Sequence, residues 1–403
     1  YTTVGEIVAW VIGWDLILEM LMAGSVVSKY WGVYLNQFFE LIGWNINTNI
    51  AIGSFNFDLA PVIIVAFFTA LLVMGTKIGA RVDGALTILK IAIVVFIVVV
   101  GFFYIKAENF TPFIPPSEPA ASTDGSGVSA VMEQPLWQWA TGMAPSIYGV
   151  TGIISGAALV FFAFLGFDVV ATASEETINP KKNVPLGIGV GLGLIIVLYT
   201  LVAIVTTGMV SYKDLAKQSD PSLAVAFKMV GADWAAKIIS LGIVIGMATV
   251  VMVLLLGLTR VVFAMSRDGL LPRGLSHTGK HGTPVRLQII VGVVMALIAA
   301  CCNVGILSDM VNIGTLSAFT LVAISIPIMR KKRPDLERSF KIPGNPWVPI
   351  LIALANLWLM VNLSVLTWIR FVVWLIVGFA IYFGYGYRHA RLGAGELEVA
   401  AQE

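Results

Sequence analysis

The sequence predicts an all-α polytopic membrane protein. Two observations carry this prediction: 58% of the 403 residues are hydrophobic while only 12% are charged, and the apolar residues gather in long runs. A run of about 20 apolar residues can cross a bilayer as a helix, and a helix satisfies its own backbone hydrogen bonds in lipid. We therefore expect the lipid bilayer to surround most of the chain.

Ten hydrophobic runs are long enough to span a membrane, and they predict ten transmembrane helices. The runs cover residues 5–36, 59–75, 84–105, 152–174, 185–210, 237–266, 286–304, 310–329, 347–364 and 366–386.

The distribution of Lys and Arg predicts the orientation of these spans. Cytoplasmic connections carry an excess of positive charge. If the spans alternate from a cytoplasmic N-terminal end, most of the Lys and Arg of the connections lie inside, and both chain ends are cytoplasmic. The residues placed outside are Lys106, Lys213, Lys217, Lys228 and Lys237.

Two carboxylates interrupt the first run. Asp15 and Glu19 are four residues apart and therefore share one face of a helix. That face must turn away from lipid, because a charge in hydrocarbon is costly. Two readings stay open: a polar contact that holds helices together, or a role in handling substrate or protons.

Lys90 is the single charge of the third run after Asp83. Its long side chain could extend back to the membrane surface. The alternative is a buried amine that gains and loses a proton, which would couple transport to a proton gradient.

The fourth run contains an interruption, within the stretch Gly156–Pro180. Four phenylalanines crowd around Ala163 and Gly166, and Asp168 follows at once inside a run that is still apolar. Glycine adopts backbone angles that other residues avoid, and unwound backbone at membrane depth is tolerated where it lines a cavity or meets a ligand. The pattern predicts either a broken helix that binds a substrate or a glycine kink whose second half is capped by Asp168.

Other functional classes find no support in the sequence. Cys301 and Cys302 are adjacent in an apolar run, and the three histidines fall in polar connections. No HExxH, CxxC or phosphate-binding motif is present, and a net charge of +2 gives no reason to expect a nucleic acid partner. We expect no enzyme, because the spans hold no histidine and no paired nucleophile and base, and we expect no cofactor and no metal.

Several stretches together resemble one family. They are FFAFLGFDVVATASEETINPKKNVPLGI, GWDLILEM, the span around Lys90, TRVVFAMSRDGLLP followed by TPV, NIGTL and RKKRPDLERSFKIP. Between Gly5 and about Tyr387 the chain resembles the bacterial cationic amino acid transporters of the amino acid–polyamine–organocation superfamily.

The resemblance implies a LeuT-like fold of two inverted five-helix repeats. The ten runs match the family's helices three to twelve, so the family's first two helices, the first of them also broken, are absent from residues 1–403. We expect a single transporter domain at 1–387, truncated at its N-terminal end, and a cytoplasmic tail at 388–403.

The resemblance also assigns roles to single residues. The substrate amine is expected at the carbonyls of the break, with the ring of Phe162 closing over the substrate; Glu19 and Asp168 match acidic positions. The proposed substrate-binding set is Phe162, Ala163, Phe164, Leu165, Gly166, Asp168, Glu19, Leu255 and Leu256. Lys90 matches a lysine that takes the place of a sodium ion in proton-coupled members, and Thr249 lies in the helix beside it.

The expected function is a secondary active amino acid permease of the bacterial cytoplasmic membrane that works by alternating access. Protons are the expected coupling ion, and a cationic amino acid is one possible substrate. Two alternatives stay open: a non-transporting scaffold or amino acid sensor of the same fold, and a sodium-coupled transporter. A small membrane-protein partner is compatible with the family, but the sequence assigns none.

Overall fold

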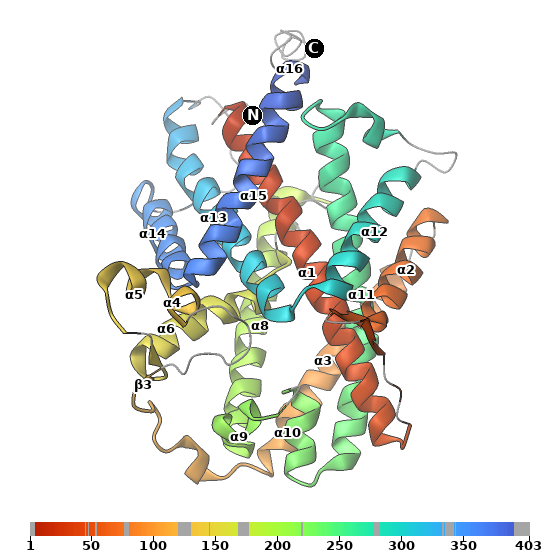
Figure 1. Ribbon diagram of the computed structural model, residues 1–403, viewed down its shortest axis with the longest axis vertical. Helices are drawn as coiled ribbons and strands as arrows, with labels where there is room; N and C mark the ends of the chain where they lie inside the picture. The colour runs from red at the N-terminus through yellow and green to blue at the C-terminus, as the bar shows by residue number, and fades with distance from the viewer. Residues whose placement is uncertain are drawn as a thin grey trace.

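The computed structural model describes residues 5–390 except 45, 47, 53–54, 76–79, 120–129, 145, 168–176, 219–220, 278–282, 333, 335–341 and 343. The described chain is predominantly helical (Figure 1), which confirms the all-α prediction.

Ten apolar helices coincide with the ten predicted runs. Among the described residues, six of them are long and apolar enough to cross a bilayer, and the other four are shorter. The ten are α1 (Glu6–Leu41), α2 (Leu59–Val73), α3 (Ala80–Phe102), α6 (Gly149–Val160) with the 3-10 turn η2 (Phe161–Phe164), α8 (Pro180–Met209), α11 (Asp233–Arg267), α12 (Val285–Cys301), α13 (Val304–Lys332), α14 (Trp347–Val361) and α15 (Val365–Ile381).

Shorter elements fill the connections. The helical ones are η1 (Ala107–Phe110), α4 (Ala130–Glu133), α5 (Leu136–Thr141), α9 (Tyr212–Ala216), α10 (Leu223–Met229), η4 (Arg273–Ser276), the π-turn η5 (Tyr382–Gly386) and α16 (Tyr387–His389). Two antiparallel pairs of strands join β1 (Asn49–Ile52) to β2 (Phe55–Asp58) and β3 (Glu118–Pro119) to β4 (Ser146–Ile147).

Local chemistry sets several helix limits. The carboxylate of Asp58 accepts a hydrogen bond from the Ala60 amide at 3.3 Å and so caps the start of α2. At its C-terminal end, α11 stops just before Gly269, whose φ of +82° favours glycine.

The start of α1 and the end of the described chain lie at the same end of the molecule, whereas α9 and α10 lie at the opposite end (Figure 1). This arrangement agrees with the orientation expected from Lys and Arg. Residues 388–390 continue from the last helix, and Ala390 is buried against the body of the protein. The remainder of the expected tail, 391–403, lies outside the described residues.

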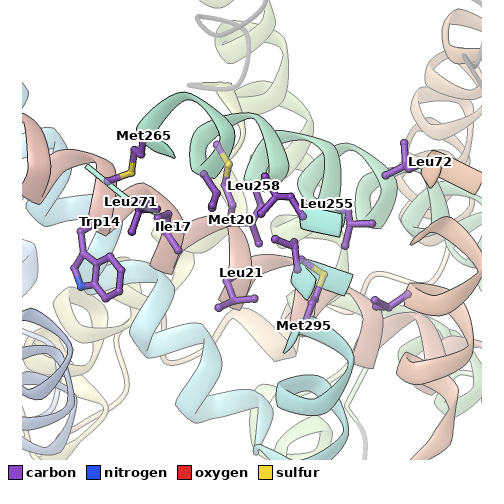
Figure 2. Packing of buried hydrophobic residues seen from close by; sticks show 14 of the residues in the cluster. Trp14, Ile17, Met20, Leu21, Leu72, Leu255, Leu258, Met265, Leu271 and Met295 are labelled. Carbon is purple, nitrogen blue, oxygen red and sulfur yellow. The ribbon is translucent and has the colours of Figure 1, made fainter. Parts of the chain in front are cut away.

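Helix α1 is the centre of the fold and contacts α2, α11, α12, α13 and α15. It is buried on several sides because apolar residues surround it instead of forming one stripe. Figure 2 shows Met20 and Leu21 of α1 beside Leu255 and Leu258 of α11 and Met295 of α12. These side chains form the largest apolar cluster around the helix.

At the end of the molecule where α9 and α10 lie, an ion pair joins two connections. Lys213 of α9 donates to the Glu118 carboxylate of β3 at 2.9 Å. This hydrogen bond, together with the negative charge of Glu118, raises the pKa of Lys213. Because both side chains are exposed, the pair is a surface contact between two connections and adds little to stability.

Candidate binding site at a broken helix

The backbone of the fourth apolar helix is interrupted. Helix α6 ends at Val160, the chain continues through η2, Leu165 is extended with φ −65° and ψ 152°, and Gly166 has φ +103°. The Leu165 amide donates to the Phe162 carbonyl at 3.2 Å, which closes the turn. A side chain at position 166 would be strained at this φ, so the glycine is what permits the interruption.

Aromatic rings brace both sides of the break. The ring of Phe319 on α13 lies 6.2 Å from the ring centroid of Phe161 and 5.2 Å from that of Phe167. On another side, Phe164 meets Tyr199 of α8 with centroids 5.5 Å apart. One side chain of α13 therefore spans the interrupted segment from end to end.

Three helices form the wall opposite the break. Phe162 and Leu165 lie against an apolar cluster made of Ala23 on α1, Leu254 on α11 and Val311 on α13. The expected residues Phe162, Phe164, Leu165 and Gly166 are all half-buried, whereas Ala163 is exposed. The structure thus brings the break into contact with the centre of the fold.

Asn312 holds the end of α6 in place. Its side chain is fully buried on α13, and its Nδ2 donates to the Leu159 carbonyl at 3.3 Å. The last carbonyls of a helix have no partner within the helix, and a break leaves them without a following turn. The sequence signal for this residue was a polar amide inside an apolar run, in the NIGTL stretch.

Both carboxylates of the first run are buried. Asp15 has no exposed surface and Glu19 has 3%, so their shared face is turned into the protein as predicted. Neither carboxylate oxygen of Asp15 has a hydrogen-bond partner by distance and angle within the described residues, although Ser317 of α13 faces it closely enough to interact. Whether Glu19 contacts substrate stays a prediction.

Lys90 and Thr249 both contact Gly246 of α11. Helix α3 starts at Ala80, earlier than the hydrophobic run, so Lys90 lies ten residues along it, or about 15 Å. The Lys90 stem contacts Gly246 of α11, and the carbonyl of Gly246 accepts the Thr249 hydroxyl at 2.8 Å.

The two leucines of α11 expected in the wall contact another apolar cluster. Leu255 is fully buried in the cluster between α1 and α12, and Leu256 contacts the same cluster. The residues of α11 that reach the break are Val250 and Leu254 instead. Consecutive residues of a helix point about 100° apart, so Leu254 and Leu255 contact different clusters, and contact of Leu255 and Leu256 with a substrate stays a prediction. Asp168 lies outside the described residues.

A model of the amino acid permease family matches residues 1–384. The chain belongs to the amino acid permease family. This permease is therefore a multi-pass membrane transporter and not an enzyme, as the sequence predicted.

Relatives similar to this chain are named for different substrates. The branched-chain amino acid permease BcaP of Bacillus subtilis (strain 168) is 40% identical over 402 residues, 97% of this chain and 79% of the relative. The methylthioribose transporter of the same organism is 39% identical over 400 residues, with the same shares. The mitochondrial cationic amino acid transporter 3 of Arabidopsis thaliana is 34% identical over 344 residues, 84% of this permease and 52% of the relative.

Proposed function

We propose that this permease carries a neutral aliphatic amino acid across the cytoplasmic membrane by proton-coupled alternating access, with the break at Leu165 and Gly166 as the substrate site. One observation carries the proposal: the interrupted backbone lies among α1, α11 and α13, in the centre of the fold. Interrupted helices at such positions offer backbone groups to charged parts of a substrate.

The substrate amine would be held by backbone oxygens at the break. The extended Leu165 carbonyl accepts no backbone hydrogen bond among the described residues, and the Phe162 carbonyl has a second lone pair beyond its bond to Leu165. An ammonium group donates three hydrogen bonds, so it fits such a pair of acceptors. The Phe162 ring would then cover the substrate.

The wall of the site favours an aliphatic side chain over a cationic one. Ala23, Leu254 and Val311 offer apolar surface opposite the break, and a buried cation needs a paired charge. Similarity to a permease named for branched-chain amino acids supports this choice. The similarity to a methylthioribose transporter makes methylthioribose the second candidate substrate.

Lys90 is the proposed proton-carrying group. Its stem lies against Gly246, and the Thr249 hydroxyl donates to the Gly246 carbonyl. Ala248, which precedes Thr249 in the chain, offers no side-chain oxygen. A sodium ion requires several oxygen ligands, so this pair favours a proton over sodium as the coupling ion. A lysine that changes charge alters its contacts with α11, which gives the two transport states different energies.

The test is uptake into proteoliposomes that contain the full-length protein. Radiolabelled L-leucine, L-arginine and methylthioribose are offered with an inward proton gradient, with and without sodium. We expect proton-driven leucine uptake that is lost in Lys90→Ala and kept in Lys237→Ala, the replacement of an exposed lysine on α11.

The alternatives give different results in the same assay. Sodium-driven uptake that survives Lys90→Ala would replace the proton by sodium. Uptake of arginine or methylthioribose without leucine would change the substrate class. Absence of all three activities, in protein that still folds, would favour the scaffold or sensor reading.

A further inference from the structure

Asp15 is a buried carboxyl group in the first half of α1. It lies nine residues after Glu6, or about 14 Å along the helix, and Glu6 itself accepts the Tyr382 hydroxyl at 2.9 Å. The Asp15 side chain has no exposed surface, and neither of its oxygens has a hydrogen-bond partner by distance and angle among the described residues. The proposed function gives this acid no role.

The face of α1 that carries Asp15 is turned to α13. Leu18, three residues later, belongs to an apolar cluster with Ile313 of α13 and Ala158 of α6. Gly314 of α13 lies so close that an added Cβ atom would be 3.6 Å from the Asp15 carbonyl oxygen. Asp15 therefore lies where α1 and α13 are in direct contact.

No ion pair within the described residues involves Asp15. The basic residues of α11 are exposed, as is Arg286 of α12, and those of α13 occupy its last turn. Arg370 of α15 attracts a carboxylate of α13 instead, and α2 contains no charged residue. On α1 itself, Glu19 is an acid one turn away, and Lys29 donates to a carbonyl of α12 at 2.8 Å.

These surroundings determine the charge of Asp15. A buried carboxylate without a paired cation or hydrogen-bond donors is costly, and such a group takes up a proton instead. Asp15 is therefore a neutral carboxylic acid in this conformation. Contact with water would favour the charged form and release the proton.

Ser317 of α13 connects Asp15 to more accessible surface. It faces the Asp15 carboxyl group closely enough to interact with it, and unlike Asp15 it is partly exposed. A hydroxyl group can donate one hydrogen bond and accept others, so it can pass a proton between water and a neighbouring carboxyl group. Ser317 thus supplies the path that the buried acid itself lacks.

Helix α13 also links Asp15 to the break in α6. Ser317 lies between Asn312, which donates to the last turn of α6, and Phe319, whose ring contacts rings on both sides of the break. A change at the break that moves α13 must therefore alter the contact between Ser317 and Asp15. Two positions of α13 would then differ in their affinity for a proton at Asp15.

We propose that Asp15 is a second proton-binding site, which holds a proton while α13 packs against it and releases the proton when that contact opens. The proton binds one carboxylate oxygen, giving the neutral acid, and leaves through the Ser317 hydroxyl to water, so the step needs no other reactant. The proposal deepens the proposed function and rests on it for transport, because this proton is additional to the one carried by Lys90.

Infrared spectroscopy of the full-length protein in proteoliposomes tests the charge of Asp15. A neutral carboxylic acid has a C=O stretching band that a carboxylate lacks. We expect such a band at neutral pH, its loss in Asp15→Asn, and a change in it when L-leucine is added. Asp309→Asn is the matched control and should keep the band, because Asp309 is an acid of α13 that already accepts the Thr367 hydroxyl at 3.0 Å.

Ser317→Ala tests the same site with Asp15 in place, and it decides the question if Asp15→Asn does not fold. Loss of the hydroxyl removes a hydrogen-bonding group from beside the acid, so we expect the C=O band to move to higher frequency. Ser325→Ala removes a hydroxyl that bonds within α13 itself and should leave the band where it is. A band that Ser317→Ala leaves unchanged would overturn the path through Ser317 and the proposal with it.

The ratio of protons to leucine tests the role in transport. It follows from the membrane potential that balances a fixed leucine gradient across the proteoliposome. We expect Asp15→Asn to move one proton fewer per leucine, because asparagine stays neutral throughout the cycle. Exchange of internal for external leucine needs no net proton movement and should continue in this variant. Asp309→Asn should keep the original ratio.

The remaining outcomes also decide. Absence of a band that depends on Asp15, or an unchanged proton ratio in Asp15→Asn, would overturn the proposal. Loss of the band on addition of sodium chloride at constant pH would overturn it in favour of a sodium ligand. A band that responds to pH in protein without leucine uptake would support the proton site and count against the proposed function. Proton-driven leucine uptake without such a band would leave the proposed function standing alone.

Discussion

The side chain of Lys90 lies along Gly246: a Cβ atom added to that glycine would meet Lys90 Cγ at 3.3 Å and Cε at 3.8 Å. The carbonyl of the same glycine accepts the Thr249 hydroxyl. Helices α3 and α11 are thus in contact at a residue without a side chain. The path of the Lys90 amine therefore depends on the absence of a side chain at position 246.

Gly246→Val should displace Lys90 and lower proton-driven uptake, because the branched side chain occupies the space of the lysine stem. Overpacking costs about 1–3 kcal/mol, so a thermal melt should show a folded protein with a lower Tm. Gly84→Ala on α3, where an added Cβ meets nothing within 4 Å, is the control. Full proton-driven uptake by Gly246→Val would show that the placement of Lys90 is unimportant for coupling.

Phe319→Ala should loosen the break. The ring of Phe319 contacts Phe161 and Phe167, and an aromatic pair contributes about 0.5–1.5 kcal/mol beyond its buried area. We expect a higher KM for leucine uptake together with a lower Tm. Phe383→Ala, which removes ring contacts to Phe379 and Tyr387 far from the break, should lower Tm without raising KM. Equal KM values in the two variants would contradict the bracing role.

Asn312→Leu should weaken substrate affinity and stability together. The substitution removes one of two donors to the Leu159 carbonyl, which keeps the Phe161 amide, so we expect a loss of about 0.5–1.5 kcal/mol. Asn356→Leu on α14 is the comparison, because Asn356 is buried and its Nδ2 has no partner within the described chain, so its loss should cost less. Thermal unfolding and leucine binding report the two effects, and an Asn312→Leu protein that matches Asn356→Leu in both would refute the capping role.

Features that depend on residues close together in the chain could be predicted from the sequence. The ten runs became ten helices because the length and composition of each run decide whether a helix suits lipid. The interruption of α6 was predicted for the same reason: Gly166 and its aromatic neighbours are close in the chain.

Other parts of the site depend on distant residues and could not be predicted in this way. The contact of Asn312 with Leu159 joins residues 153 positions apart. The choice of Leu254 over Leu255 for the wall depends on how α11 is rotated against α1, and both residues read as leucine in an apolar run. The resemblance placed the wall on α11, and which of its residues meet a substrate stays a prediction.

Gly378→Ala should destabilise the helix pair that closes the core. An added Cβ would meet the indole of Trp14, 2.6 Å from its Cδ1, and that ring cannot move aside, because it stacks on Trp374 at 4.4 Å and donates to the Trp374 carbonyl at 3.0 Å. We expect a loss of about 1–3 kcal/mol from overpacking. The melting temperature of the purified protein measures it.

Gly384→Ala provides the matched control for this prediction. Gly384 follows six residues later in the chain, and an added Cβ there meets nothing within 4 Å. Its Tm should stay near that of the unaltered protein. If both variants melt at the same temperature, the close approach of α1 and α15 at Trp14 does not limit stability, and the tryptophan pair can shift to accept a methyl group.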